Sequence, residues 1–550
     1  MRRFGALTLT ALLTGALLVG VSPSATAVVG AAVQGGPGDG SGRDAHGDPD
    51  RVPGVGSVTW GACVDPTLVR FGAECAMLSV PLDYSKPHGT KIQLAISRVK
   101  HTVPANKYQG IMLINPGGPG GSGLIYSIFS NFVPDGAGAA YDWIGFDPRG
   151  VGSSVPALSC IPDYSVGPRP SYEPVTRAVE AAWIQRSKSY AKACGTNGGA
   201  LLNHVKTIDN VRDMNAIRSA LGRKQINYYG FSYGTYLGQV FATTYPDRVR
   251  RMVLDANVDP RRVWYQANLD QDVAFEKVIT LFFDWVARHD STYGLGTTEA
   301  AVERTYYAAQ DALRAAPRGA LGSAEWSDAF ILAGYVQGAW PDVADAFTAF
   351  VNHDDAGPAT ALYEDSDGPG EDNSFAMYTA TECSEGVWPR DWATWHRDNT
   401  RIARQAPYLT WNNAWFNAPC SFWPVRSGTP VQVKGKDLPR FLLLSETLDA
   451  ATPFTGSLEV RKRFPSASLI ATEDGTTHAN SLNGNACVDD PIVAYLQDGT
   501  TPKRLKGKGP DVTCAASPEP EPATASAQSR TSSTAAVLDE LRLGIARANR

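Results

Sequence analysis

Residues 230–234 carry the clearest chemical pattern in the chain, a serine with a glycine two positions away on either side. They read Gly-Phe-Ser-Tyr-Gly, with Ser232 at the centre. An apolar stretch over 225–229 precedes them and a helical pattern over 235–245 follows. Glycines on both sides allow a tight strand-to-helix turn that exposes the serine hydroxyl at the carboxyl end of the strand. The pattern predicts that Ser232 is a nucleophile.

A serine hydroxyl is a weak nucleophile and needs a base, usually a histidine that an acid orients. Enzymes built on this turn place the acid and then the histidine after the serine in the chain. His478 follows the apolar run 468–471 by a short loop, which is where such a histidine is expected. Three other histidines follow Ser232 in less suitable segments: His289, His353 and His396.

The acid is expected on the loop that follows the preceding strand. Residues 441–444 are such an apolar strand, and Asp449 comes shortly after it, 29 residues before His478. Glu446 lies between them and is the alternative acid. A purely structural role for Asp449 would be to cap the helix that begins near residue 452.

Backbone N–H groups must stabilise the negative charge that develops during acyl transfer. Tyr233, directly after the serine, is expected to supply one of them. A glycine-rich segment over 115–123 follows another apolar run and is expected to supply the second, from Gly118 or, as the near alternative, Gly117. A phosphate loop would also be rich in glycine, but no Lys-Ser or Lys-Thr pair follows this one.

These residues have to be positioned by strands that end at one edge of a sheet. Short apolar runs alternate with helical patterns along the chain, which predicts an α/β fold with a mostly parallel central sheet. The segment 261–430 differs, because it contains long helical patterns and ten of the 13 tryptophans. It lies between two strands of the sheet and is predicted to be an inserted, mainly helical cap domain.

The N-terminus has the features of a secretory signal. Arg2 and Arg3 precede an apolar stretch, and residues 25–27 read Ala-Thr-Ala, a form that signal peptidase accepts. We therefore expect a secreted, extracellular protein with no membrane segment after signal removal. The predicted organisation is a signal peptide at 1–27, a flexible leader or propeptide at 28–55, the sheet domain at 56–260 and 431–514, the cap at 261–430, and a disordered linker with a short tail helix at 515–550.

The composition excludes several classes of protein. The chain has 550 residues, is 43% hydrophobic and 19% charged, and carries a formal net charge of −5. These values are typical of a globular protein and leave no basic surface for nucleic acid. They also exclude a collagen-like fibre and a multispan membrane protein.

Eight cysteines, an even number in an exported chain, favour disulfide bonds. Proximity in the sequence suggests the pairs 63/75, 160/194, 383/420 and 487/514 among the 105 possible connectivities. No Cys-x-x-Cys pattern occurs, so the spacing does not indicate a zinc site. We expect neither a metal nor another cofactor.

Several blocks together resemble the secreted tripeptidyl aminopeptidases of actinobacteria, relatives of the proline iminopeptidases within the α/β-hydrolase fold. The resemblance covers about residues 60–500, most of the expected mature chain. The matching blocks are 74–76 with 80–84, 115–123, 145–154, 228–236, 448–449 with 452–453, and 475–478 with Cys487.

This resemblance implies a serine exopeptidase that removes tripeptides from free N-termini of peptides and proteins. It implies Ser232, Asp449 and His478 as the catalytic triad, an acyl-enzyme on Ser232, and N-terminal processing as in a zymogen. Proline iminopeptidases place a histidine before the two glycines of the early loop, where this chain has Asn115 and Pro116. Removal of a single proline is therefore the less expected activity.

An aminopeptidase must bind a protonated amine, for which carboxylates are the natural partners. Glu382 and Glu385 flank Cys383 in the expected cap and are candidates for this role. They could equally be solvated acids beside a disulfide. The protein is expected to act as a monomer on peptide or protein N-termini.

Two other functions use the same sequence features. A secreted carboxylesterase would have the same triad and fold. A binding protein that kept the scaffold without catalysis would have lost a triad residue, and all three candidates are present. Esterase activity is therefore the principal alternative.

Overall fold

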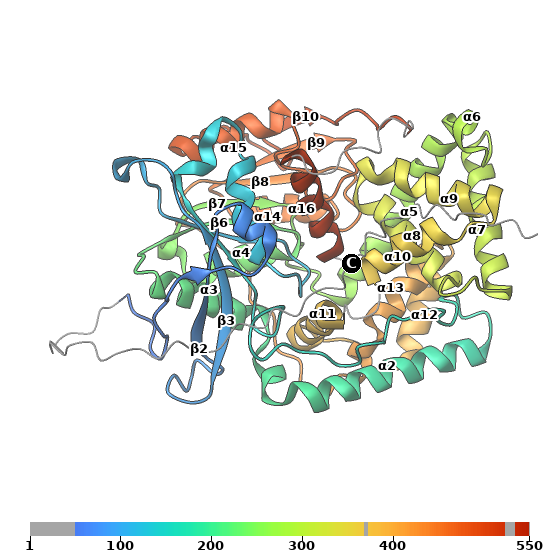
Figure 1. Ribbon diagram of the computed structural model, residues 1–550, viewed down its shortest axis with the longest axis horizontal. Helices are drawn as coiled ribbons and strands as arrows, with labels where there is room; N and C mark the ends of the chain where they lie inside the picture. Colours follow the sequence, from blue (N-terminus) through green and yellow to red (C-terminus); the bar gives the residue numbers. More distant parts are fainter. Residues whose placement is uncertain (1–49, 368–371, 523–533, 549–550) are drawn as a thin grey trace, which may run out of the picture.

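The structure is a computed structural model that describes residues 50–367, 372–522 and 534–548. The predicted signal peptide and residues 28–49 of the predicted leader lie outside these residues. Figure 1 shows a sheet with its helices in the left half of the view and a helical part in the right half.

Within the described residues, ten strands form one sheet in the order β1-β2-β3-β5-β4-β6-β7-β8-β9-β10. The neighbouring pairs from β5 through to β10 are all parallel, whereas β1, β2, β3 and β5 pair antiparallel. The predicted α/β fold with a mostly parallel sheet is confirmed. The strands are β1 (Gly61–Ala62), β2 (Glu74–Pro81), β3 (Lys91–Val99), β4 (Ile111–Asn115), β5 (Asp142–Phe146), β6 (Ile226–Phe231), β7 (Val249–Asp255), β8 (Phe441–Glu446), β9 (Ala467–Glu473) and β10 (Val512–Ala515).

The central strands are apolar because helices cover both faces of a parallel sheet. Every residue of β4, β5, β6 and β8 is buried. The helices outside the segment between β7 and β8 are α1 (Pro66–Arg70), α2 (Arg177–Gly198), α3 (Thr207–Ala220), α4 (Tyr233–Thr244), α14 (Thr455–Arg463), α15 (Ala486–Asp498) and α16 (Thr534–Ala548).

The long segment between β7 and β8 is helical, as expected for the cap. Its aromatic side chains, among them Phe282, Trp326 and Phe347, form a hydrophobic core separate from that of the sheet. Its helices are α5 (Tyr265–Arg288), α6 (Asp290–Tyr293), α7 (Glu299–Ala315), α8 (Ser323–Tyr335), α9 (Trp340–His353), α10 (Gly357–Asp367), α11 (Asp372–Glu385), α12 (Trp392–Ala403) and α13 (Thr410–Asn417).

The structure contains the four disulfides that sequence proximity suggested: Cys63–Cys75, Cys160–Cys194, Cys383–Cys420 and Cys487–Cys514. Each closes a loop of 12 to 37 residues. Such bonds stabilise a fold mainly by restricting the unfolded chain. No helix in the described part of the chain is both long and apolar enough to cross a membrane.

Ordered structure begins earlier than the sequence suggested. The expected flexible leader extended to residue 55, but Val52 N–H donates to Ser219 Oγ at 2.8 Å and Lys91 Nζ donates to the Gly54 oxygen at 2.6 Å. Asp50 forms an ion pair with Arg248. These contacts are made by backbone groups and one charged side chain, so the low apolar content of the segment did not indicate them.

The C-terminal segment crosses from the sheet to the cap. Within the expected linker, the Pro520 oxygen accepts a hydrogen bond from Trp285 Nε1 at 3.0 Å, and Glu519 pairs with Arg288 at 2.8 Å. Helix α16, where a short tail helix was expected, then buries Leu541 and Ile545 against the protein.

Helix α16 contacts both halves of the molecule. The Leu541 oxygen accepts from the hydroxyl of Tyr126, in the 3₁₀ segment Leu124–Phe132 after β4, at 3.1 Å. At its other end Arg547 forms an ion pair with Asp365 of α10 in the cap. In Figure 1 the helix lies between the sheet and the cap helices.

Candidate active site

Ser232 lies in the sharp turn between β6 and α4, as predicted. Its backbone has φ 53° and ψ −123°, a left-handed conformation that is strained for a residue with a side chain. A Cβ on Gly234 would lie 2.7 Å from the Asn115 oxygen, and one on Gly230 would lie 2.5 Å from the Gly234 oxygen. The two glycines are therefore required by close backbone approach. The backbone N–H of Ser232 donates to the backbone carbonyl oxygen of Asp255 at 3.0 Å and fixes the turn.

His478 and Asp449 lie in contact, although 29 residues separate them. His478 Nδ1 is 2.9 Å from Asp449 Oδ2, and both side chains are fully buried. Asp449 also accepts from the backbone N–H groups of Ala451 and Thr452 and from the Thr452 hydroxyl, at 2.8 to 3.0 Å. These bonds hold the carboxylate toward Nδ1. His478 Nε2, the nitrogen that would serve as the base, has no hydrogen-bond partner among the described residues.

The cap supports the histidine from the other side. His478 N–H donates to the Tyr335 oxygen at 2.8 Å, at the end of α8. The Tyr335 ring stands edge-on to the imidazole, with the ring centres 5.5 Å apart. The cap therefore helps to fix both the loop and the ring of His478.

Glu446, the alternative acid, contacts the loop around His478 rather than the imidazole. Its carboxylate accepts from Thr477 N–H and from Asn480 Nδ2. Burial raises the pKa of Glu446 to about 8. At the end of the next strand, Asp255 accepts from Ser481 N–H at 2.8 Å. Two buried acids from adjacent strands therefore hold the loop that carries the histidine.

The two expected donors of backbone N–H, Gly118 and Tyr233, both line the pocket that Ser232 lines. Tyr233 is the first residue of α4, where backbone N–H groups have no partner within the helix. The alternative donor, Gly117, already gives its N–H to Asn115 Oδ1 at 3.0 Å. Gly118 lines the pocket and Gly117 is not among its lining residues, so the position of Gly118 fits the proposed donor better.

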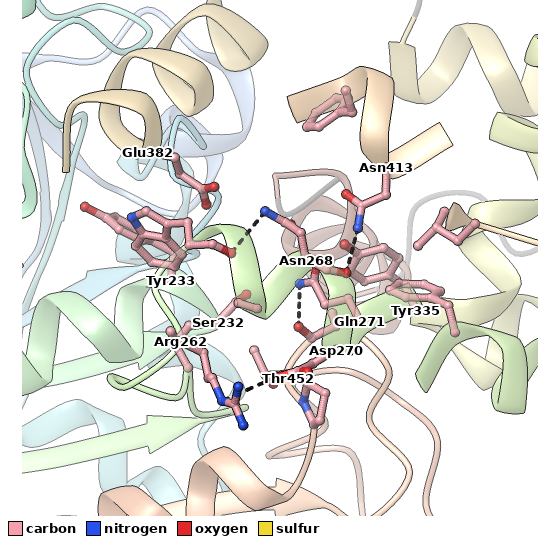
Figure 2. A pocket seen from close by; sticks show the side chains of 18 of the residues that line it. Ser232, Tyr233, Arg262, Asn268, Asp270, Gln271, Tyr335, Glu382, Asn413 and Thr452 are labelled. Atoms are coloured by element: carbon pink, nitrogen blue, oxygen red, sulfur yellow. Dashed lines mark hydrogen bonds and ion pairs between the residues drawn. The ribbon is translucent and has the colours of Figure 1, made fainter. Parts of the chain in front are cut away.

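The pocket lies between the sheet and the cap (Figure 2). Its apolar wall comes mainly from the cap and includes Trp264, Phe275, Ile331, Tyr335, Leu409 and Phe416. The opening carries Arg262 and Asp270, which are 3.7 Å apart and partly exposed. Such an apolar pocket with a few polar groups is typical of a site for an organic substrate.

The two candidate amine ligands have different surroundings. Glu382 lines the pocket, is 4% exposed, and has one oxygen, Oε2, without a hydrogen-bond partner among the described residues. Burial raises the pKa of Glu382 well above its ordinary value. Glu385 instead accepts from Thr207 N–H at 2.6 Å at the start of α3, and it is absent from the residues that line the pocket. The structure brings Glu382, and not Glu385, to the pocket of Ser232.

Comparison with known proteins shows the family of the chain. A model of the TAP-like protein family matches residues 406–514, and a model of the alpha/beta hydrolase fold matches residues 110–367. The chain is 41% identical over 471 residues to the tripeptidyl aminopeptidase of Streptomyces lividans, which covers 83% of this chain and 86% of that protein. The chain belongs to the tripeptidyl aminopeptidase family.

Two further relatives carry other names. The serine protease Hip1 of Mycobacterium tuberculosis is 34% identical over 480 residues, covering 81% of this chain and 89% of that protein. Carboxylesterase B of the same species is 32% identical over 472 residues, covering 81% and 88%. The prediction of a serine aminopeptidase with the α/β-hydrolase fold is thus confirmed at the level of the family.

Some residues that line the pocket of this family member were not singled out from its sequence. Asn268, Gln271 and Asn412 turn their amide nitrogens into the protein, toward the Trp264 oxygen, the Ala451 oxygen and Asp328 respectively. Their acceptor partners fix these orientations. Asn268 and Gln271 are three apart near the start of a helix, a spacing that places both on one face and is the only signal the sequence offered.

Proposed function

We propose that the protein is a secreted serine exopeptidase that releases tripeptides from free N-termini of peptides and proteins, through an acyl-enzyme on Ser232. The observation that carries this proposal is the buried, unpaired oxygen of Glu382 in the same pocket as Ser232. A neutral ester substrate has no need of such a group, whereas the α-ammonium of a peptide pairs with it.

We assign the catalytic roles as follows from the chemistry of each group. His478 Nε2 takes the proton of the Ser232 hydroxyl as the oxygen attacks the scissile carbonyl. Asp449, bound to Nδ1, stabilises the imidazolium that forms. The N–H groups of Gly118 and Tyr233 stabilise the oxyanion. His478 then gives the proton to the leaving amine, and water releases the N-terminal fragment from Ser232.

Glu382 is proposed to bind the α-ammonium, while Glu385 holds the start of α3. Since burial raises the pKa of Glu382, an arriving ammonium favours its ionised form and displaces its proton. Substrate binding is therefore expected to strengthen as the pH rises, until the α-amine itself loses its proton near pH 8.

Secretion is supported by the signal-like residues 1–27 and by four disulfides, which form in oxidising compartments. We propose that the mature form acts as a monomer on peptide and protein N-termini.

The test compares the release of a reporter amine from Ala-Pro-Ala with its release from single-residue, dipeptide and N-acetylated versions. Rapid cleavage of the free tripeptide only, and its loss in Ser232→Ala, are the expected results. Glu382→Gln should raise KM for the free tripeptide and leave the weak cleavage of the acetylated one unchanged.

Esterase activity is the second candidate, because a relative named carboxylesterase is 32% identical over most of the chain. Hydrolysis of simple aryl esters that exceeds peptide cleavage, with no effect of Glu382→Gln on either, would favour the esterase.

A further inference from the structure

Trp264 carries a buried hydrogen-bond donor in the pocket, and no group of the described residues accepts from it. It directly precedes α5, its side chain lines the pocket, and the residue is 5% exposed. Its indole Nε1–H has no partner among the described residues. A buried donor left in this state costs about 1 to 3 kcal/mol, so native proteins rarely keep one without a reason.

Unpaired indoles are not a general property of this tryptophan-rich protein. Trp388, Trp395 and Trp415 each donate to a backbone oxygen at 2.8 to 2.9 Å. In the described part of the chain, only Trp264 and Trp326 have a buried indole N–H without a partner. Trp326 lies in the cap core and does not line the pocket of Ser232.

The indole of Trp264 is held next to the nucleophile turn. Its ring centre is 5.8 Å from that of Tyr233 and 5.3 Å from that of Tyr236. Gly386 also packs closely against the backbone of Val263 and Trp264 and restricts its movement. A Cβ on Gly386 would lie only 3.1 Å from the Val263 carbonyl oxygen and 3.5 Å from the Trp264 backbone nitrogen. The N–H therefore has little freedom to find a partner within the protein.

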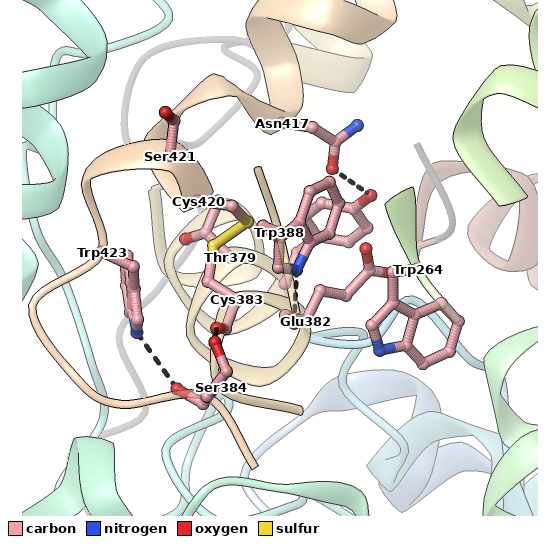
Figure 3. The surroundings of a disulfide bond; sticks show 12 residues. Trp264, Thr379, Glu382, Cys383, Ser384, Trp388, Asn417, Cys420, Ser421 and Trp423 are labelled. Atoms are coloured by element: carbon pink, nitrogen blue, oxygen red, sulfur yellow. Dashed lines mark hydrogen bonds between the residues drawn. A yellow bond between two sulfur atoms is a disulfide. The ribbon is translucent and has the colours of Figure 1, made fainter. Parts of the chain in front are cut away.

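Glu382 provides the matching acceptor. Figure 3 shows its side chain beside that of Trp264, and both residues line the same pocket. The two do not bond to each other, since Glu382 Oε2 and Trp264 Nε1 both lack partners among the described residues. One wall of the pocket thus carries a donor and an acceptor that have no hydrogen-bond partner in the part of the chain that the structure describes.

We propose that Trp264 is a specificity-determining residue, whose Nε1–H donates to the first carbonyl of the bound peptide while Glu382 accepts from its α-ammonium. An N-terminal residue carries these two groups on either side of one Cα, so an adjacent acceptor and donor match it. This inference rests on the proposed aminopeptidase function. It assigns recognition of the N-terminal residue to two contacts, of which one is independent of charge.

The first test is Trp264→Phe, which removes the N–H and keeps an aromatic ring. Trp326→Phe is the matched control, because it removes the other buried, unpaired indole N–H away from the pocket. With the free Ala-Pro-Ala reporter, Trp264→Phe should raise KM about five- to tenfold with little change in kcat, as expected for one lost hydrogen bond. Trp326→Phe should match the wild type.

The second test changes the substrate. An analogue whose first peptide bond is replaced by an alkene has lost the carbonyl oxygen. The wild type and Trp326→Phe should cleave it at least fivefold less efficiently than the parent, and Trp264→Phe should cleave the two substrates with nearly equal efficiency.

The proposal would be overturned if Trp264→Phe preferred the parent tripeptide over the alkene analogue as strongly as the wild type does. Equal cleavage of parent and analogue by the wild type, a result that needs no variant to fold, would also overturn it. Failure of the aminopeptidase function itself would be seen separately, as a wild type that does not cleave the parent tripeptide in a Ser232-dependent way.

Discussion

Glu446 allows a quantitative prediction about pH and stability. Burial raises its pKa from the ordinary 4.5 to about 8. Between these values the folded protein keeps a proton that the unfolded chain releases. The contribution of protonated Glu446 to the free energy of unfolding is therefore fully present below pH 4.5. It is lost as the pH rises through about 8. The whole shift corresponds to about 5 kcal/mol, at about 1.4 kcal/mol for each pKa unit.

Glu446→Gln removes this dependence because an amide does not ionise. Glutamine offers one acceptor oxygen for Thr477 N–H and Asn480 Nδ2, so the variant should start about 1 to 3 kcal/mol less stable at pH 5. Between pH 5 and pH 9 the wild type should then lose about 4 kcal/mol relative to the variant, since about three units separate pH 5 from the pKa of Glu446. For a chain of this length, about 1 kcal/mol shifts Tm by about 1 °C.

Thermal unfolding of both proteins, followed by circular dichroism from pH 5 to pH 9, measures this difference. The two Tm curves should cross. Asp255→Asn is the control, because burial raises the pKa of Asp255 only to about 6. The Tm difference between this variant and the wild type should therefore stop changing once the pH exceeds about 6. Parallel Tm curves for Glu446→Gln and the wild type from pH 5 to pH 9 would refute the reasoning.

Three further outcomes are expected. Asp449→Asn should lower kcat about 10⁴-fold in the reporter assay, because His478 loses the carboxylate at its Nδ1; near-normal turnover would return the role of the acid to Glu446. Replacing Cys383 and Cys420 by alanine should reduce stability by about 3 to 4 kcal/mol, as measured by urea unfolding, since their bond closes a loop of 37 residues. Leu541→Ala should lower Tm by about 2 °C in thermal unfolding, because the side chain is 4% exposed where α16 meets the sheet domain; an unchanged Tm would mean that this contact adds nothing to stability.

The turn at Ser232 and the contact of His478 with Asp449 agree with the sequence prediction, because each residue was placed by the order of strands and loops along the chain. The catalytic roles of the three residues stay predictions. Ser232, Asp449 and His478 each follow an apolar strand, and parallel strands end at one edge of a sheet. The choice between Glu382 and Glu385 could not be made in this way. They are three residues apart on one helix, and only the folded structure shows that Glu382 lines the pocket while Glu385 accepts from Thr207 N–H.

The long-range contacts of polar segments could not be predicted from the sequence either. Residues 50–55 and 515–522 have compositions typical of flexible chain, because they contain few large apolar side chains. Their contacts are instead made by backbone N–H and C=O groups and by ion pairs with distant partners, such as Trp285 and Arg288. The unpaired indole of Trp264 was also hidden, since a sequence does not show which buried donors lack an acceptor.

The path of the chain end has a mechanical consequence for the enzyme. Each of the four disulfides closes a loop within the sheet domain or within the segment 261–430, so no covalent cross-link joins the two. Separation of the two halves must break the contacts of Pro520 with Trp285 and of α16 with its two neighbours. The chain end therefore links the sheet domain to the segment 261–430 through residues that do not line the pocket of Ser232.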